Sequence, residues 1–222
     1  MADKTQDDIL FQEIDEELRQ DRAQQLWKEY GKYAVAAAIV IVIGVAGYKG
    51  WQNYDLSTRQ ADGEQFNTAL NLAATDKNDE AFKAFATLAG DGTKGYQLLA
   101  RFSQAGMLSK SGKSQEASIA YRVLADDVSI DPIYRNLAVI LGAYEDLNAS
   151  GADFKELEKR LQPLMENTSA WRFSAQEITG LIAKRSGDKA RAKKLFSGLS
   201  ADNAAPQGIR TRAQEMLSIL DQ

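Results

Sequence analysis

A run without any charged residue, from Tyr33 to Tyr48 (YAVAAAIVIVIGVAGY), constrains this chain more than any other stretch. As a helix rising about 1.5 Å per residue, it spans roughly 24 Å, which is short of a hydrocarbon core of about 30 Å. Aromatic residues extend it on both sides, as is typical of the two interfaces of a membrane helix. They are Trp27, Tyr30 and Tyr33 before it and Tyr48, Trp51 and Tyr54 after it. Residues 33–54 are therefore predicted to form a transmembrane helix with its interfacial flank.

Two other interpretations of this run stay open. A buried core helix is usual for apolar runs of about 10 to 14 residues, but it needs no aromatic residues at both ends. A cleaved signal peptide is disfavoured because the run follows a long acid-rich segment and because Ala46-Gly47-Tyr48-Lys49 is a poor cleavage site.

The basic residues around the span predict its orientation. Four lie in the twenty residues before Tyr33, and two in the twenty after Tyr48. This bias favours a cytoplasmic N-terminus. Residues 1–32 are then a cytoplasmic charged helical segment, and residues 55–222 form a domain across the membrane. In a bacterium that domain is periplasmic, and the chain is a single-pass inner-membrane protein. A chain without cysteine is compatible with that oxidising compartment.

Composition removes most enzyme classes. The chain has no histidine and no cysteine, so a Cys nucleophile, a Ser-His-Asp triad and a His- or Cys-based zinc site are all unavailable. No phosphate-binding glycine motif or nucleophile-elbow motif occurs either. We therefore predict neither an enzyme nor a cofactor. With 27 basic and 31 acidic residues, the net charge of −4 also gives no electrostatic footprint for nucleic acid.

Two segments of the exported part, 105–124 and 180–199, share one pattern. Each has a small residue, then a glycine seven residues later, then a small, an aromatic and an apolar residue at steps of five, four and three. This pattern is typical of tetratricopeptide hairpins, in which small residues let two helices cross closely. The residues are Ala105, Gly112, Ala117, Tyr121 and Leu124, and Gly180, Gly187, Ala192, Phe196 and Leu199.

Weaker copies complete the repeat. Ala81 and Leu157 occupy the place of Ala117 and Ala192, and these four positions are 36, 40 and 35 residues apart, although the first copy lacks a turn glycine. We therefore predict an all-α fold, in which a transmembrane helix precedes an α-solenoid of about four hairpins. A capping helix from Pro206 to about Asp221 closes it, with a polar outer side at Arg210, Arg212, Gln214 and Asp221.

Binding residues are expected on the exposed side of the first helix of each hairpin, which lines the concave surface of such stacks. An ordinary core or solvated role is the alternative for each of them. The candidates are Leu99, Phe102, Ser109 and Lys110 in the second hairpin, and Ser174, Glu177, Leu181, Lys184 and Arg185 in the fourth.

The combination of these features resembles a known family. Residues 11–33 (FQEIDEELRQDRAQQLWKEYGKY), the short Ala/Ile/Val span, YKGWQNY at 48–54 and the degenerate hairpins are similar to the bacterial ancillary Sec translocon subunit family. The resemblance implies a single-span inner-membrane protein with a periplasmic helical domain, associated with the Sec translocon and with periplasmic chaperones. It implies no catalytic residues.

These patterns favour a membrane-anchored adaptor for protein partners: translocon subunits, periplasmic chaperones or exported chains. The alternative is a scaffold for envelope assembly or cell division, which acts through its repeats or through homo-oligomerisation. The charged segment at residues 8–33 is either a solvated stalk or a helix with a docking partner of its own.

Overall fold

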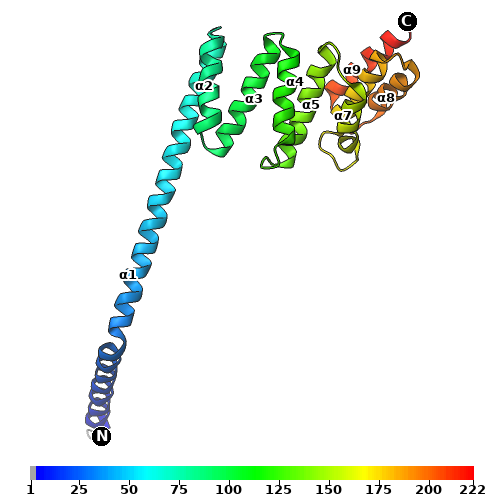
Figure 1. The fold of residues 1–222 in the computed structure, drawn as a ribbon. Coiled ribbons are helices and arrows are strands. Elements are labelled where there is room, and N and C mark those ends of the chain that lie inside the picture. The colour runs from blue at the N-terminus through cyan, green and yellow to red at the C-terminus, as the bar shows by residue number, and fades with distance from the viewer. Residues whose placement is uncertain (1–3) are drawn as a thin grey trace. The chain divides into compact units, whose positions relative to one another are not determined.

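The computed structural model describes the backbone of residues 4–222 and the side chains of residues 18–22 and 24–222 (Figure 1). The described residues form helices and connecting turns, and they include no strand. The chain divides into two compact units, Met1–Arg59 and Gln60–Gln222. The predicted all-α class is confirmed.

Helix α1 (Lys4–Ala74) is continuous over 71 residues. It crosses both predicted boundaries, at 32/33 and 54/55, so these boundaries would mark changes of surroundings and not ends of secondary structure. A helix satisfies its own backbone hydrogen bonds, and it therefore continues equally well in water and in lipid.

Within the described residues, α1 is the one helix long and apolar enough to cross a membrane. None of its apolar stretch is buried, and Val40 is 69% exposed. The interpretation as a buried core helix is therefore wrong, because such a helix would be covered by other parts of the chain.

The second unit, residues 60–222, is a row of helices that pack in sequence order. The end of α1 pairs with α2, α3 with α4, α5 with α6, and α7 with α8, while α9 packs against α8 (Figure 1). The bounds are α2 (Asn78–Asp91), α3 (Lys94–Lys110), α4 (Ser114–Asp126), α5 (Pro132–Asn148), α6 (Phe154–Leu161), the short 3₁₀ helix η1 (Gln162–Met165), α7 (Arg172–Arg185), α8 (Lys189–Ala201) and α9 (Gln207–Leu220). The predicted four hairpins and final helix are confirmed.

The hairpin turns use the left-handed backbone region. Gly112, Gly151 and Gly187 have φ of 74°, 79° and 82°, where glycine has no steric penalty. In the first hairpin Asp76 takes this place with φ of 58°, seven residues after Ala69 just as Gly112 follows Ala105. Aspartate is among the few other residues that enter this region readily, which explains how the first hairpin turns without a glycine.

Small residues occupy the helix crossings, as predicted. Ala105, Ala117 and Ala192 are fully buried, and so are Ala69 and Ala81 in the weaker first copy. At Gly180 an added Cβ would lie 2.8 Å from the ring of Phe196, which is too close for real atoms. The aromatic residue of the pattern thus fills the space that the small residue leaves on the facing helix.

The third hairpin departs from the expected helix length of about 12 to 20 residues. Its second helix, α6, has only 8 residues and runs into η1. Pro163 explains this, because proline lacks the N–H that would continue the α-helical hydrogen bonds. Leu157, Leu161 and Leu164 nevertheless stay buried across the change of helix type, so the core of this hairpin is preserved.

Helix α9 closes the unit through Ile209, Ala213 and Leu220, which are buried against α7 and α8. Asp221, which ends this helix, pairs with Lys193 of α8 at 2.7 Å. Arg212 is the exception to the predicted polar outer side, because its guanidinium reaches back to α7.

Candidate partner-binding surface

The four candidate residues on α3 divide into exposed and engaged side chains. Leu99 is 49% exposed, and Lys110 is exposed at the end of the helix. Phe102 is half-buried, with its ring 6.1 Å from that of Tyr121 on α4. The hydroxyl of Ser109 donates to Glu145 Oε1 of α5 at 2.5 Å. Leu99 and Lys110 are therefore the members of this group with free surface.

The five candidates on α7 divide in the same way. Arg185 is exposed, with its guanidinium 5.8 Å from the centre of the Phe154 ring. Ser174, Leu181 and Lys184 are half-buried, and Lys184 Nζ lies 3.7 Å from the sulfur of Met216 on α9. Glu177 is only 3% exposed, so its carboxylate is part of the interior.

Two adjacent residues of α5 connect the α3 group to the α7 group. Glu145 accepts the hydrogen bond from Ser109, and the hydroxyl of the preceding residue, Tyr144, donates to Glu177 Oε2 at 3.0 Å. The two predicted groups do not touch each other, because α5 lies between them in the stack. They are instead linked through side chains that cross from one first helix to the next.

Arg212 extends this chain of contacts to α9. Its Nε donates to Glu177 Oε1 at 2.6 Å and its Nη2 donates to Oε2 at 2.8 Å. Such a two-pronged pair fixes geometry as well as charge. We call Ser109, Tyr144, Glu145, Glu177 and Arg212 the polar ladder, since together they join α3, α5, α7 and α9.

The surroundings of Tyr144 and Arg212 keep both side chains in the protonation states that donate hydrogen bonds to the buried Glu177. Burial first, and then the negative charge of Glu177, raise the pKa of Tyr144 above its ordinary value, so the phenol stays neutral and donates. The hydrogen bond to Glu177 raises the pKa of Arg212, so the guanidinium stays charged. A buried carboxylate is costly unless it is paired and fully hydrogen-bonded, and Glu177 receives three such bonds.

A profile of the tetratricopeptide repeat-like domain family matches residues 24–215 of the chain. The chain belongs to this family. It is also 24% identical over 187 residues to the ancillary SecYEG translocon subunit of Haemophilus influenzae, across 82% of this chain and 87% of that protein. The resemblance to the ancillary Sec translocon subunit family is therefore confirmed. No solved structure matches the chain.

In this tetratricopeptide repeat-like protein, three ladder residues were not predicted as site residues: Tyr144, Glu145 and Arg212. The three contacts join residues 36, 33 and 35 positions apart, which is about one repeat each. One sequence signal would have identified them. It is a polar residue that lies one repeat away from another polar residue, on a helix face that is otherwise apolar.

Two hollows of about 390 Å³ each lie beside the second helices of the hairpins. One lies between α4 and the short α6, beside Ile119, Arg122 and Asp146, and the other lies between α2 and the α3–α4 turn, beside Phe82. Ile119 is 53% exposed there. None of the nine candidate residues lines either hollow, and the residues that the structure describes include no cluster suited to a metal ion.

Proposed function

We propose that this protein is a non-enzymatic adaptor, anchored by α1 in the bacterial inner membrane and ancillary to the Sec translocon. Residues 1–32 are cytoplasmic, residues 33–54 cross the membrane with their flank, and residues 55–222 are periplasmic. The observation that carries the proposal is the combination, in one chain, of an unburied apolar helix with a tetratricopeptide repeat-like unit. The apolar helix would hold the protein in the membrane, and the repeat unit offers a surface to which other proteins bind.

The partner class comes from the relative in Haemophilus influenzae, whose name describes an ancillary subunit of the SecYEG translocon. Both chains are matched over more than four fifths of their lengths, so the relationship is not confined to one short motif. By this proposal the present chain also associates with translocon subunits, and its repeat unit links emerging exported chains to periplasmic chaperones.

The nine candidate residues have three different roles in this proposal. Leu99, Lys110 and Arg185 have exposed side chains, and they contact the partner directly. Ser109 and Glu177 are engaged inside the polar ladder, and they hold neighbouring first helices in register. Phe102, Ser174, Leu181 and Lys184 are half-buried, and they border the contact. A partner therefore meets a surface that is organised before it binds, which reduces the entropy lost on binding.

Photocrosslinking in native membranes tests this proposal. A photoreactive residue at Leu99, Lys110 or Val42 should trap translocon subunits or periplasmic chaperones. The matched control for Leu99 is Ile119 of α4, which is 53% exposed against 49% for Leu99 and lies beside the short α6, and it should trap fewer of them. Products that contain only envelope-assembly or division proteins, or only a second copy of this chain, would favour the scaffold alternative and contradict the translocon assignment.

A further inference from the structure

We infer that the stretch of α1 just before the span, from Arg19 to Tyr33, binds the anionic lipid headgroups of the membrane that α1 enters. The inference rests on the proposed membrane anchor and adds a second, electrostatic contact to it. The surface involved is an exposed helix face, and its occupant is the bilayer itself, because the same helix continues into the apolar run.

Side chains of two kinds share this face. At about 100° per residue, two arginines and four apolar or aromatic residues share a sector of roughly 140°, and all six are exposed. Leu26, Trp27 and Tyr30 are 59%, 66% and 56% exposed. An apolar and aromatic face with arginines beside it is the pattern of helices that lie at a membrane surface. The six are Arg19, Arg22, Leu26, Trp27, Tyr30 and Tyr33.

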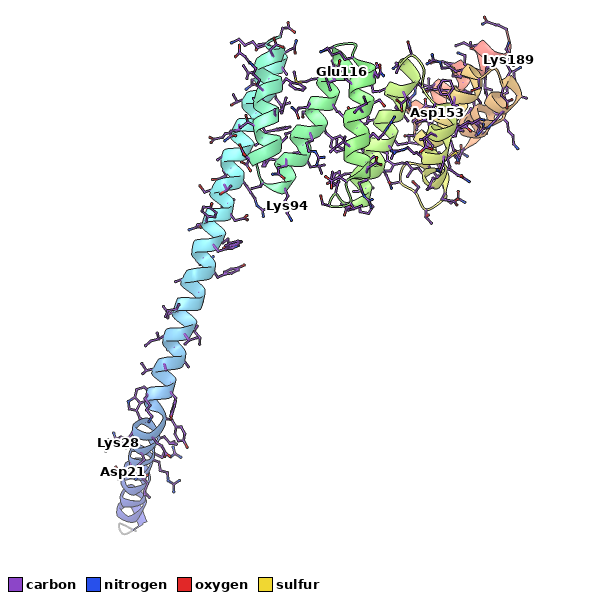
Figure 2. The ribbon with its side chains drawn as sticks, in the orientation of Figure 1. Asp21, Lys28, Lys94, Glu116, Asp153 and Lys189 are labelled. Carbon is purple, nitrogen blue, oxygen red and sulfur yellow. The ribbon has the colours of Figure 1, made fainter. Side chains whose placement is uncertain are left out.

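The acids of the segment lie elsewhere. Asp21, labelled in Figure 2, falls on the opposite side of the helix, as does Lys28, and Glu29 lies outside the edge of the sector. The sequence also separates charge along the chain. Residues 3–17 contain seven acids and one lysine, whereas residues 18–33 contain four basic and two acidic residues. The basic stretch is therefore next to the membrane and the acidic stretch is kept away from it.

Distance makes Gly31 important. On a straight helix Arg19 would lie roughly 21 Å before Tyr33, beyond the screening length of about 8 to 10 Å at physiological salt. Glycine weakens a helix at its position, and Gly31 lies between the basic face and the span. The ring of Trp27 covers it, so that an added Cβ would lie 3.1 Å from the indole. The inference therefore includes a bend of α1 at Gly31 at the membrane surface, which would bring Arg19 and Arg22 to the headgroups.

The expected size of the effect follows from two arginines. Each basic residue near an anionic surface favours the bound position about fivefold, and two together favour it by roughly 30-fold. This preference disappears in a bilayer of zwitterionic lipid, and it weakens as salt is raised.

The test uses the full chain with Trp51→Phe and Trp171→Phe, which leaves Trp27 as its sole tryptophan. The protein is inserted into nanodiscs of phosphatidylcholine alone or with phosphatidylglycerol. Quenching of Trp27 by acrylamide should fall, and quenching by brominated lipid should rise, when phosphatidylglycerol is present. Arg19→Gln with Arg22→Gln should abolish this difference, whereas Arg19→Lys with Arg22→Lys should keep it.

Two failures are distinguishable. If carbonate extracts the protein from both lipid compositions, the anchor fails, and with it the proposed function. If the protein stays inserted but Trp27 is quenched equally in both compositions, the lipid inference alone is overturned. Protection that requires another purified protein, and not phosphatidylglycerol, would also overturn it, because the face would then be a protein-binding site.

Discussion

The apolar run of α1 and the repeat unit use small residues in opposite ways. In the run, an added Cβ at Gly44 or Gly47 would meet nothing within 4 Å, whereas at Gly180 in the repeat unit it would collide with the ring of Phe196. The space beside Gly180 is therefore occupied by another part of the chain, whereas the space beside Gly44 and Gly47 is open to lipid or to another helix. Small residues in the repeat unit allow its own helices to pack closely. Those in the run leave room for contacts with lipid or with a helix of another protein.

The largest expected effect comes from emptying a filled crossing. Phe196→Ala removes a fully buried ring and should lower the free energy of unfolding of the repeat unit by about 3 to 5 kcal/mol. Val40→Ala is the control in the apolar run, where the side chain is 69% exposed, and it should leave unfolding unchanged. Urea denaturation, followed by circular dichroism, compares the two. Equal losses would contradict the distinction between the regions.

A filled crossing should also resist a larger residue. Gly180→Ala places a methyl group 2.8 Å from the Phe196 ring, and should cost about 1 to 3 kcal/mol of stability through overpacking. Gly44→Ala meets open space and should have no such cost. The melting temperatures of the two variants measure the difference, and an unchanged value for Gly180→Ala would show that the crossing is looser than described.

The polar ladder is a second difference between the two regions, because all of its residues lie in the repeat unit. Arg212→Gln leaves Glu177 buried without its cation. We expect a loss of about 1 to 2 kcal/mol, less than the roughly 3 to 5 kcal/mol of a fully buried pair, because the Arg212 side chain is 53% exposed. Arg185→Gln is the exposed control and should change stability by no more than about 0.5 kcal/mol. Equal values for both variants would mean that the ladder adds no stability.

The smallest effect concerns pH. Hydrogen bonds from Ser129 and then from Arg101 lower the pKa of Asp127 to about 2. Because this pKa is lowered, the stabilisation is complete above the ordinary value of about 3.9 and is lost as pH falls towards 2. Arg101→Gln should raise the pKa of Asp127, as measured by NMR titration. A titration unchanged by this substitution would remove Arg101 from the explanation.

The sequence predicts the hairpins because close helix crossings require small residues at a fixed spacing. Ala105, Gly180 and Ala192 lie at the positions that this spacing requires. The short α6 was missed, although Pro163 marks its end, because the apolar spacing of Leu157, Leu161 and Leu164 continues past it. The Glu177–Arg212 pair was also missed, because an arginine on a terminal helix is expected to face solvent. Side-chain pairs between repeats depend on how the repeats stack, and local pattern does not contain that information.

The candidate surface is predictable to the level of the helix and not to the level of the residue. The nine positions lie on α3 and α7 as their spacing in the repeat requires. Whether each side chain is available depends on neighbours one repeat away: Glu145 engages Ser109, and Arg212 engages Glu177. Leu99, by contrast, remains 49% exposed.

A protease-accessibility experiment tests whether α1 anchors the repeat unit at the membrane. Cells that carry the full chain with an N-terminal tag are treated with protease after the outer membrane alone has been permeabilised. The account predicts that residues 55–222 are digested, while a fragment that holds the tag and the span stays protected and resists carbonate. A protected repeat unit with a digested tag, or a chain that carbonate releases from the membrane, would contradict it.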